Sequence, residues 1–130
     1  MKELHYTTSI TPLPILQAVD KWNDRYIIQD KGEQTFSETG VKVWKQLIVI
    51  LEAPLSYENI VAAIVSAKYS NDDVTAITLN YLLAVHNEVG EDKKEEYANE
   101  YKTLQAWRQK AKEIAKEVLE YWEENNKEAT

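Results

Sequence analysis

The 130-residue sequence contains no cysteine, two histidines and three glycines, and its purely apolar runs are short, at most the six residues 60–65, with five at 47–51. The missing cysteine excludes disulfides, thiolate nucleophiles and thiolate metal sites. These short apolar runs fall far below the roughly 18 to 20 residues that cross a bilayer, so we expect no membrane contact. Because Gly32, Gly40 and Gly90 are isolated, neither a phosphate loop nor a dinucleotide fingerprint is present.

Basic residues are also in the minority. The sequence has 15 Lys and Arg against 22 Asp and Glu, which gives a net charge of -7. Nucleic-acid binding usually depends on cationic side chains that displace counterions from phosphates, so the balance argues against a nucleic-acid partner. The N-terminal residues lack the apolar segment and cleavage site of a secretory signal. We therefore expect a cytoplasmic protein.

A chain of this length normally forms one domain, and 44% hydrophobic with 28% charged residues is typical of a globular protein. The pattern predicts an α+β fold in which a small antiparallel N-terminal sheet is followed by three helices, the last of them long. Residues 1–55 form a β-rich subregion with a short helix, and residues 56–124 form a helical subregion. Residues 125–130 are expected to be a frayed tail.

The N-terminal subregion shows short strand and helix signals. Leu4, Tyr6 and Thr8 alternate with polar residues as in an edge strand. A short helix is predicted after Pro14 from apolar residues at helical intervals, namely Ile15, Ala18, Val19 and Trp22. Residues 26–28 and 35–36 are strand candidates, and Gly32 between them can supply the positive φ of a turn, so we expect a two-stranded ribbon.

The segment 41–52 is rich in β-branched residues and is followed by Pro54. An apolar face of period two favours a strand here: Val41, Val43, Leu47, Val49 and Leu51. Lys45 interrupts that face, and a helix remains the competing interpretation. The choice decides whether the N-terminal sheet has a long central element.

Two shorter helices are predicted next. Ser56 and Ser70 are suitable N-caps, the first for a helix over residues 57–68. In the second helix, Asp72 and Asp73 occupy the first turn, and Gly90 marks a stop. Its inward face is predicted to contain Val74, Ile77, Tyr81, Leu82 and Val85.

The last helix is expected over about residues 91–124, a length of roughly 50 Å. Its apolar residues advance by three and four, which defines a heptad seam: Leu104, Trp107, Ala111, Ile114, Val118 and Tyr121. Tyr97 and Tyr101 extend the seam toward the N-terminus. Either this helix folds over the sheet and the two shorter helices, or part of it pairs with another copy of the chain.

The sequence offers no arrangement of residues for catalysis. His5 and His86 have no closely spaced companion ligand. The acidic pair Asp72 and Asp73, and the acidic residues near 91–96, lack the glycine-containing loop of a calcium site and are explained by helix starts. We therefore expect no enzyme, no metal site and no cofactor.

Aromatic residues are more informative, because eight tyrosines and four tryptophans stand against one phenylalanine. Tyr and Trp suit interfaces that are apolar on one side and wet on the other, although half-buried positions at the core edge suit them equally. Arg108, Lys112 and Lys116 add a basic edge, which neighbouring glutamates neutralise in the simpler interpretation. The candidate partner-binding residues are Tyr97, Tyr101, Leu104, Trp107, Arg108, Ile114, Val118, Tyr121 and Trp122.

One resemblance adds to this interpretation. The runs YENIVAAIVSAKYSNDDVTAI, NYLLA and LQAWR, which lie within residues 56–120, resemble the C-terminal part of small phage and prophage proteins of gut bacteria. The same half is distantly similar to the helical end of phage tail-fibre assembly proteins. The resemblance implies a protein encoded by a virus, with virion or tail proteins as partners and a cytoplasmic or virion-associated location. It implies no catalytic residues.

We therefore expect a non-enzymatic protein–protein interaction module that serves as a minor virion (tail) component or an assembly chaperone, with a homo-oligomer as a further option. The alternative is an acidic phage inhibitor of a host protein, which would present carboxylates to a basic groove. Lysines interleave with the glutamates of the last helix, whereas a phosphate mimic needs an uninterrupted acidic row. That pattern disfavours the alternative.

Overall fold

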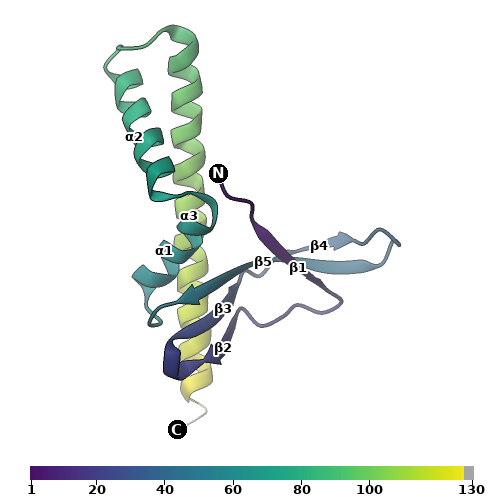
Figure 1. The fold of residues 1–130 in the computed structure, drawn as a ribbon. Coiled ribbons are helices and arrows are strands. Elements are labelled where there is room, and N and C mark those ends of the chain that lie inside the picture. Colours follow the sequence, from purple (N-terminus) through teal and green to yellow (C-terminus); the bar gives the residue numbers. More distant parts are fainter. Residues whose placement is uncertain (128–130) are drawn as a thin grey trace.

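The computed structural model describes residues 1–127, with side chains as far as Asn125. An antiparallel sheet of five strands precedes three helices, so the fold class is α+β, as predicted (Figure 1). The strands are β1 (His5–Ser9), β2 (Leu16–Asp20), β3 (Arg25–Gln29), β4 (Glu33–Phe36) and β5 (Lys42–Glu52), with a 3-10 turn η1 at Lys21–Asn23. The helices are α1 (Tyr57–Lys68), α2 (Asn71–Val85) and α3 (Glu91–Lys127).

Strand β5 is the centre of the sheet, whose order is β1-β5-β3-β2 with β4 also paired to β5. Its first half pairs with β1 on one edge and β4 on the other, and its second half pairs with β3. Leu47, Val49 and Leu51 are buried on one face, while Ile50 on the other is 55% exposed. This alternation confirms the strand prediction for residues 41–52 and removes the helical alternative.

The short helix predicted after Pro14 is wrong. Residues 16–20 form strand β2, and only the single turn η1 follows. Ala18 pairs with Tyr26 of β3, and Leu16 is the one buried residue of β2. The backbone hydrogen bonds to β3 are long-range interactions that the local apolar spacing does not reveal, and they override the helical period.

The ribbon predicted from residues 26–28 and 35–36 is correct in its strands and wrong in its pairing. β3 and β4 do not pair with each other, because both lie along the same edge of β5. Gly32 lies in the break between them with φ +70°. The positive φ that the sequence predicted is therefore present, but it redirects one edge of the sheet instead of closing a hairpin.

Helix α3 runs unbroken past the sheet (Figure 1), and α1 packs on both α3 and β5. Its heptad seam is buried within the chain: Leu104, Ala111 and Val118 are fully buried, and Trp107 and Ile114 are nearly so. The helix therefore folds over the sheet and α1. Helical structure continues to Lys127, so residues 125–127 are not frayed, and residues 128–130 of the predicted tail lie outside the described part.

Candidate protein-interaction surface

Helices α2 and α3 form an antiparallel hairpin that projects away from the sheet (Figure 1). At the start of α2, the Ser70 hydroxyl accepts the Asp73 N–H at 3.0 Å, and the Asp73 carboxylate accepts the Ser70 N–H at 3.1 Å. This reciprocal capping fixes where the helix begins. Asn87, with φ +57°, takes the left-handed conformation that ends it. The start of α2 is therefore the one that the Ser70 cap predicted, whereas the left-handed residue at its end is Asn87 and not the predicted stop Gly90.

One face of α2 packs on α3, through Val74, Ile77, Tyr81 and Ala84. Tyr81 stacks on Tyr101 of α3 with ring centroids 4.0 Å apart and an interplanar angle of 5°. The prediction that Leu82 and Val85 face inward is wrong, because these side chains are 47% and 54% exposed. Ala84 takes the inner position, since the spacing of three, four and three from Val74 reaches residue 84.

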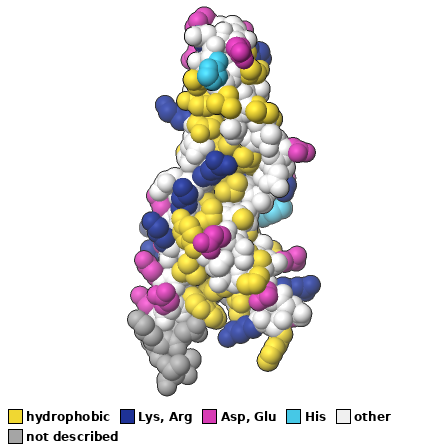
Figure 2. Space-filling view, turned by 90° about the vertical axis from the view of Figure 1, so that its left-hand side faces the viewer, with side chains coloured by type: hydrophobic (Ala, Val, Ile, Leu, Met, Phe, Trp, Pro, Cys, Tyr) yellow, Lys and Arg dark blue, Asp and Glu magenta, His cyan; other side chains and the backbone are white. Residues whose placement is uncertain are grey.

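The opposite side of α2 exposes large aliphatic side chains. Leu79 is 55% exposed, and Leu82 and Leu83 lie three and four residues further on, so these leucines share one side of the helix. Val85 lies on the flank near the tip. We call Leu79, Leu82, Leu83 and Val85 the α2 leucine face. Figure 2 looks onto α2 and shows hydrophobic side chains gathered along it below the tip.

No Asp, Glu, Lys or Arg occurs between residues 74 and 87, although 28% of the whole chain is charged. The nearest carboxylates are those of Asp72 and Asp73 before the segment and Glu88 after it. A surface helix normally carries charged residues on its solvent side. A helix that is apolar on both sides is instead typical of a buried element, and within the described chain α2 is covered on one side only.

The predicted partner-binding residues of α3 divide into two groups. Leu104, Trp107, Ile114 and Val118 belong to the hydrophobic core, so their assignment to an exposed partner surface is corrected. The Trp107 indole N–H donates to the Ile64 carbonyl at 3.0 Å, which satisfies its polar atom inside the protein. Their heptad spacing reflects contact with α1 and the sheet.

The second group remains partly exposed: Tyr97, Tyr101, Arg108, Tyr121 and Trp122. Tyr101 is engaged by Tyr81, and the Lys21 ammonium lies 5.5 Å from the centroid of the Trp122 ring. Tyr101 therefore lies at the contact with α2, whereas Trp122 lies beside η1 at the other end of α3. The structure therefore does not gather the predicted residues into one surface. The sequence feature that could have revealed the α2 leucine face is the segment between residues 74 and 87, which contains no charged residue.

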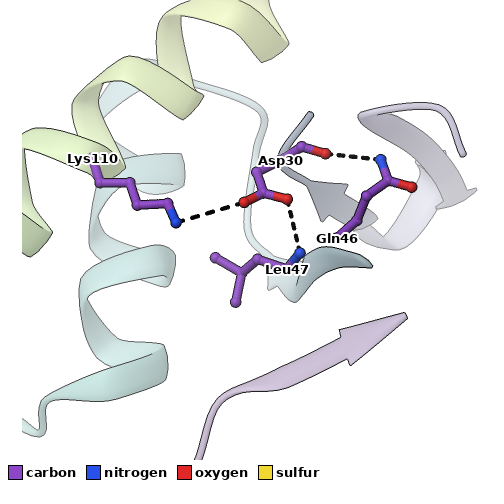
Figure 3. Close-up of polar contacts among 4 residues, drawn as sticks. All are labelled: Asp30, Gln46, Leu47 and Lys110. Carbon is purple, nitrogen blue, oxygen red and sulfur yellow. Dashed lines mark hydrogen bonds and ion pairs between the residues drawn. The ribbon is translucent and has the colours of Figure 1, made fainter. Parts of the chain in front are cut away.

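A polar cluster at the break between β3 and β4 has a structural role (Figure 3). The Asp30 carboxylate accepts the Leu47 N–H at 2.8 Å and lies 3.7 Å from the Lys110 ammonium. The buried Gln46 amide donates to the backbone carbonyls of Leu13, at 3.0 Å, and Asp30, at 2.8 Å. These bonds replace the strand ladder where β3 stops, and they tie α3 to the sheet.

The titratable residues considered from the sequence lie apart. His5 is in β1 and His86 caps the C-terminal end of α2, and the described residues contain no group of three His, Asp or Glu placed to hold a metal ion. At the start of α3, Lys94 pairs with Glu91 at 3.3 Å and Lys93 with Glu96 at 3.0 Å. The hydrogen bond to Glu96 raises the pKa of Lys93.

Comparisons with known proteins add no relative. Scans against protein-family models, curated proteins and solved structures each found no match to this chain. In the described part of the chain, no helix is long and apolar enough to cross a membrane. The function proposed below therefore rests on the residues and their arrangement.

Proposed function

We propose that the chain is a non-enzymatic protein–protein interaction module that self-associates through the α2 leucine face. On the basis of the sequence resemblance, we place it among phage proteins, as a minor virion or tail component or an assembly chaperone. The observation that carries the interaction role is the exposure of Leu79, Leu82 and Leu83 in a helix segment without charges. Covering these side chains removes apolar surface from water, which stabilises the contact by about 25 cal/mol for each Å² buried.

The absence of charge favours a second copy as the occupant. A partner with a charged surface would leave its charges desolvated and unpaired against this face. An identical face brings only aliphatic and neutral polar side chains, so the two copies meet without like charges in contact despite a net charge of -7 on each. A two-fold axis places the same patch on both sides of the contact.

The helix dipoles select the direction of the pair. In a parallel arrangement, the two dipoles would repel, and Asp72 and Asp73 of one copy would lie beside Asp72 and Asp73 of the other. An antiparallel arrangement brings the N-terminal carboxylates of one α2 toward the C-terminal end of the other, which carries Glu88 as well as His86. Its advantage is that the two helix dipoles then oppose each other favourably. We therefore propose an antiparallel contact centred between Leu79 and Leu82.

The alternative role, an acidic inhibitor that mimics phosphates, gains no support from this surface. The most exposed apolar helix face is uncharged, and acidic residues of α3 are neutralised in part by Lys93 and Lys94. A mimic would need carboxylates aligned without such partners. We retain self-association as the leading proposal.

Multi-angle light scattering tests this role. The parent protein is expected to elute with about twice the monomer mass of 15.1 kDa. Leu79→Glu plus Leu83→Glu is expected to give the monomer, because a dimer would bury each new carboxylate in the contact between the two chains. The control Gln34→Glu plus Gln109→Glu adds the same charge at exposed positions away from α2 and is expected to retain the parent mass. A monomeric parent protein would refute the proposal.

A further inference from the structure

Strand β5 has one edge that β1 covers only in part. Successive residues of a strand direct their backbone N–H and C=O groups to opposite edges. The N–H and C=O of Leu47 are bonded to Asp30, on the side of β3 and β4. The backbone groups of Ile48 and Ile50 therefore point to the other edge, toward β1.

Pairing on that edge ends early. The last residue pair between the two strands is His5 with Ile48, and no described residue pairs with Ile50 there. The chain before His5 leaves the sheet and is held on α1, because the Lys2 N–H donates to the Lys68 carbonyl at 2.9 Å. The Lys2 ammonium also donates to the Ser66 carbonyl at 2.9 Å. These bonds hold the N-terminal segment out of the strand ladder, although Glu3 and Leu4 still border the same hollow as β5.

An open hollow of about 800 Å³ lies between the departing N-terminal segment, β5 and α1. On the β5 side it is lined by Ile48, Val49 and Ile50. On the α1 side it is lined by small side chains, including Ala63 and Ala67. Small residues on α1 leave room beside the free strand edge, where a larger side chain would fill the gap.

We propose that this edge of β5 binds an extended peptide segment of a protein partner, which adds to the sheet as a further strand beyond His5. An extended peptide is the occupant that matches the edge, because only a strand supplies alternating donors and acceptors to the Ile50 N–H and C=O. This proposal is independent of self-association through α2, since it concerns a different edge and different residues.

The residues that line the hollow determine which side chains such a peptide would carry at each position. A residue opposite Val49 has its side chain on the same face as Val49, toward α1. That face is lined by Ala63 and Ala67, so it accepts an aliphatic side chain. The next residue, opposite Ile50, lies on the outer face, where Ile50 is 55% exposed. The preferred sequence therefore alternates aliphatic residues with residues that tolerate water.

Amide NMR with a synthetic probe tests the site. The peptide Lys-Val-Thr-Val-Thr-Val-Lys, added up to about 1 mM, is expected to shift the amide signals of Val49, Ile50 and Ala63 and to slow hydrogen exchange at Ile50; that range suits a few backbone hydrogen bonds and one pocket. A peptide with proline in place of the central valine cannot donate from that position and is expected to cause smaller shifts. Absence of shifts, or shifts confined to other elements, would overturn the proposal.

Two matched variants distinguish binding at this site from non-specific binding. Ala63→Leu fills the hollow and is expected to weaken peptide binding about tenfold or more. Ala62→Leu adds the same side chain at the exposed neighbouring position and is expected to bind as the parent does. Equal weakening in both variants, or in neither, would contradict the assignment. Folding of each variant is checked by the parent-like dispersion of its amide spectrum.

Discussion

At the scale of single residues, Asp30 stabilises the point where the partner of β5 changes from β3 to β4. Its carboxylate is the acceptor for the N–H of Leu47, a residue that is only 2% exposed. Asp30→Ala would leave that N–H without a partner and is expected to lower the free energy of unfolding by about 1–3 kcal/mol. Asp30→Asn keeps an acceptor oxygen and should cost less. Urea unfolding measures both, and equal stability of the two variants would contradict this role.

Gly32 makes the same break sterically possible. A Cβ at this position would collide with the Lys45 carbonyl oxygen and the Gln46 Cγ, and its φ of +70° adds strain for any other residue. Gly32→Ala is expected to destabilise the protein by more than the roughly 1–2 kcal/mol of the left-handed conformation alone. Gly40→Ala is the control, because Gly40 has φ +80° but a Cβ added there would meet no atom within 4 Å. Equal losses in urea unfolding would argue against the collision.

Asp73 gives the stability of the hairpin a pH dependence. The hydrogen bond from the Ser70 N–H lowers the pKa of Asp73 below its ordinary value of 3.8. A carboxyl whose pKa is lower in the folded state stabilises the fold above its unfolded pKa, and this contribution is lost as pH falls through the folded value. The loss is therefore expected below about pH 4. Asp73→Asn should show a flatter fall of the urea midpoint there; parallel curves would contradict the link.

At the scale of elements, local signals locate the helices well. Ser56 and Ser70 cap α1 and α2 as predicted, and α3 begins at Glu91 after Gly90. The pairing of strands is not accessible in the same way. Residues 15–22 carry a helical spacing, yet hydrogen bonds to β3 make most of them a strand, and one sequence contains no direct record of such distant pairing.

The contact between α2 and α3 includes an aromatic pair. Tyr81 and Tyr101 stack with centroids 4.0 Å apart, and the effects of removing them should therefore not be additive. A double-mutant cycle with Tyr81→Leu and Tyr101→Leu is expected to show a coupling of about 0.5–1.5 kcal/mol. The free energies come from urea unfolding. A coupling near zero would mean that the stack contributes only its buried area.

At the scale of the whole molecule, the site is harder to predict than the fold. The heptad seam of α3 correctly indicates a covered helix, but the covering elements are α1 and the sheet. The α2 leucine face escapes prediction because its residues look equally suited to an inner face, as the incorrect inward placement of Leu82 illustrates. Only the lack of charge between residues 74 and 87 distinguishes α2 as a helix that is apolar on both sides.

The molecule then combines two proposed contacts on separate surfaces. The hairpin projects from the sheet and offers the α2 leucine face, while the free edge of β5 lies beside α1 near the N-terminus (Figure 1). A dimer formed through α2 would carry two such edges. Binding of an extended segment by each edge would be strengthened by avidity when the partner repeats that segment.

The most direct test of self-association uses the absence of cysteine. A single cysteine introduced as Leu82→Cys lies near the proposed two-fold axis, so mild oxidation is expected to yield a covalent dimer on a non-reducing gel. Ala106→Cys is the control, because Ala106 is exposed on α3 outside the α2 leucine face. This variant is expected to run as a monomer on the same gel, since its cysteines do not meet in the proposed dimer. If Leu82→Cys remains a monomer, or cross-links no faster than Ala106→Cys, the α2 leucine face does not contact a second copy.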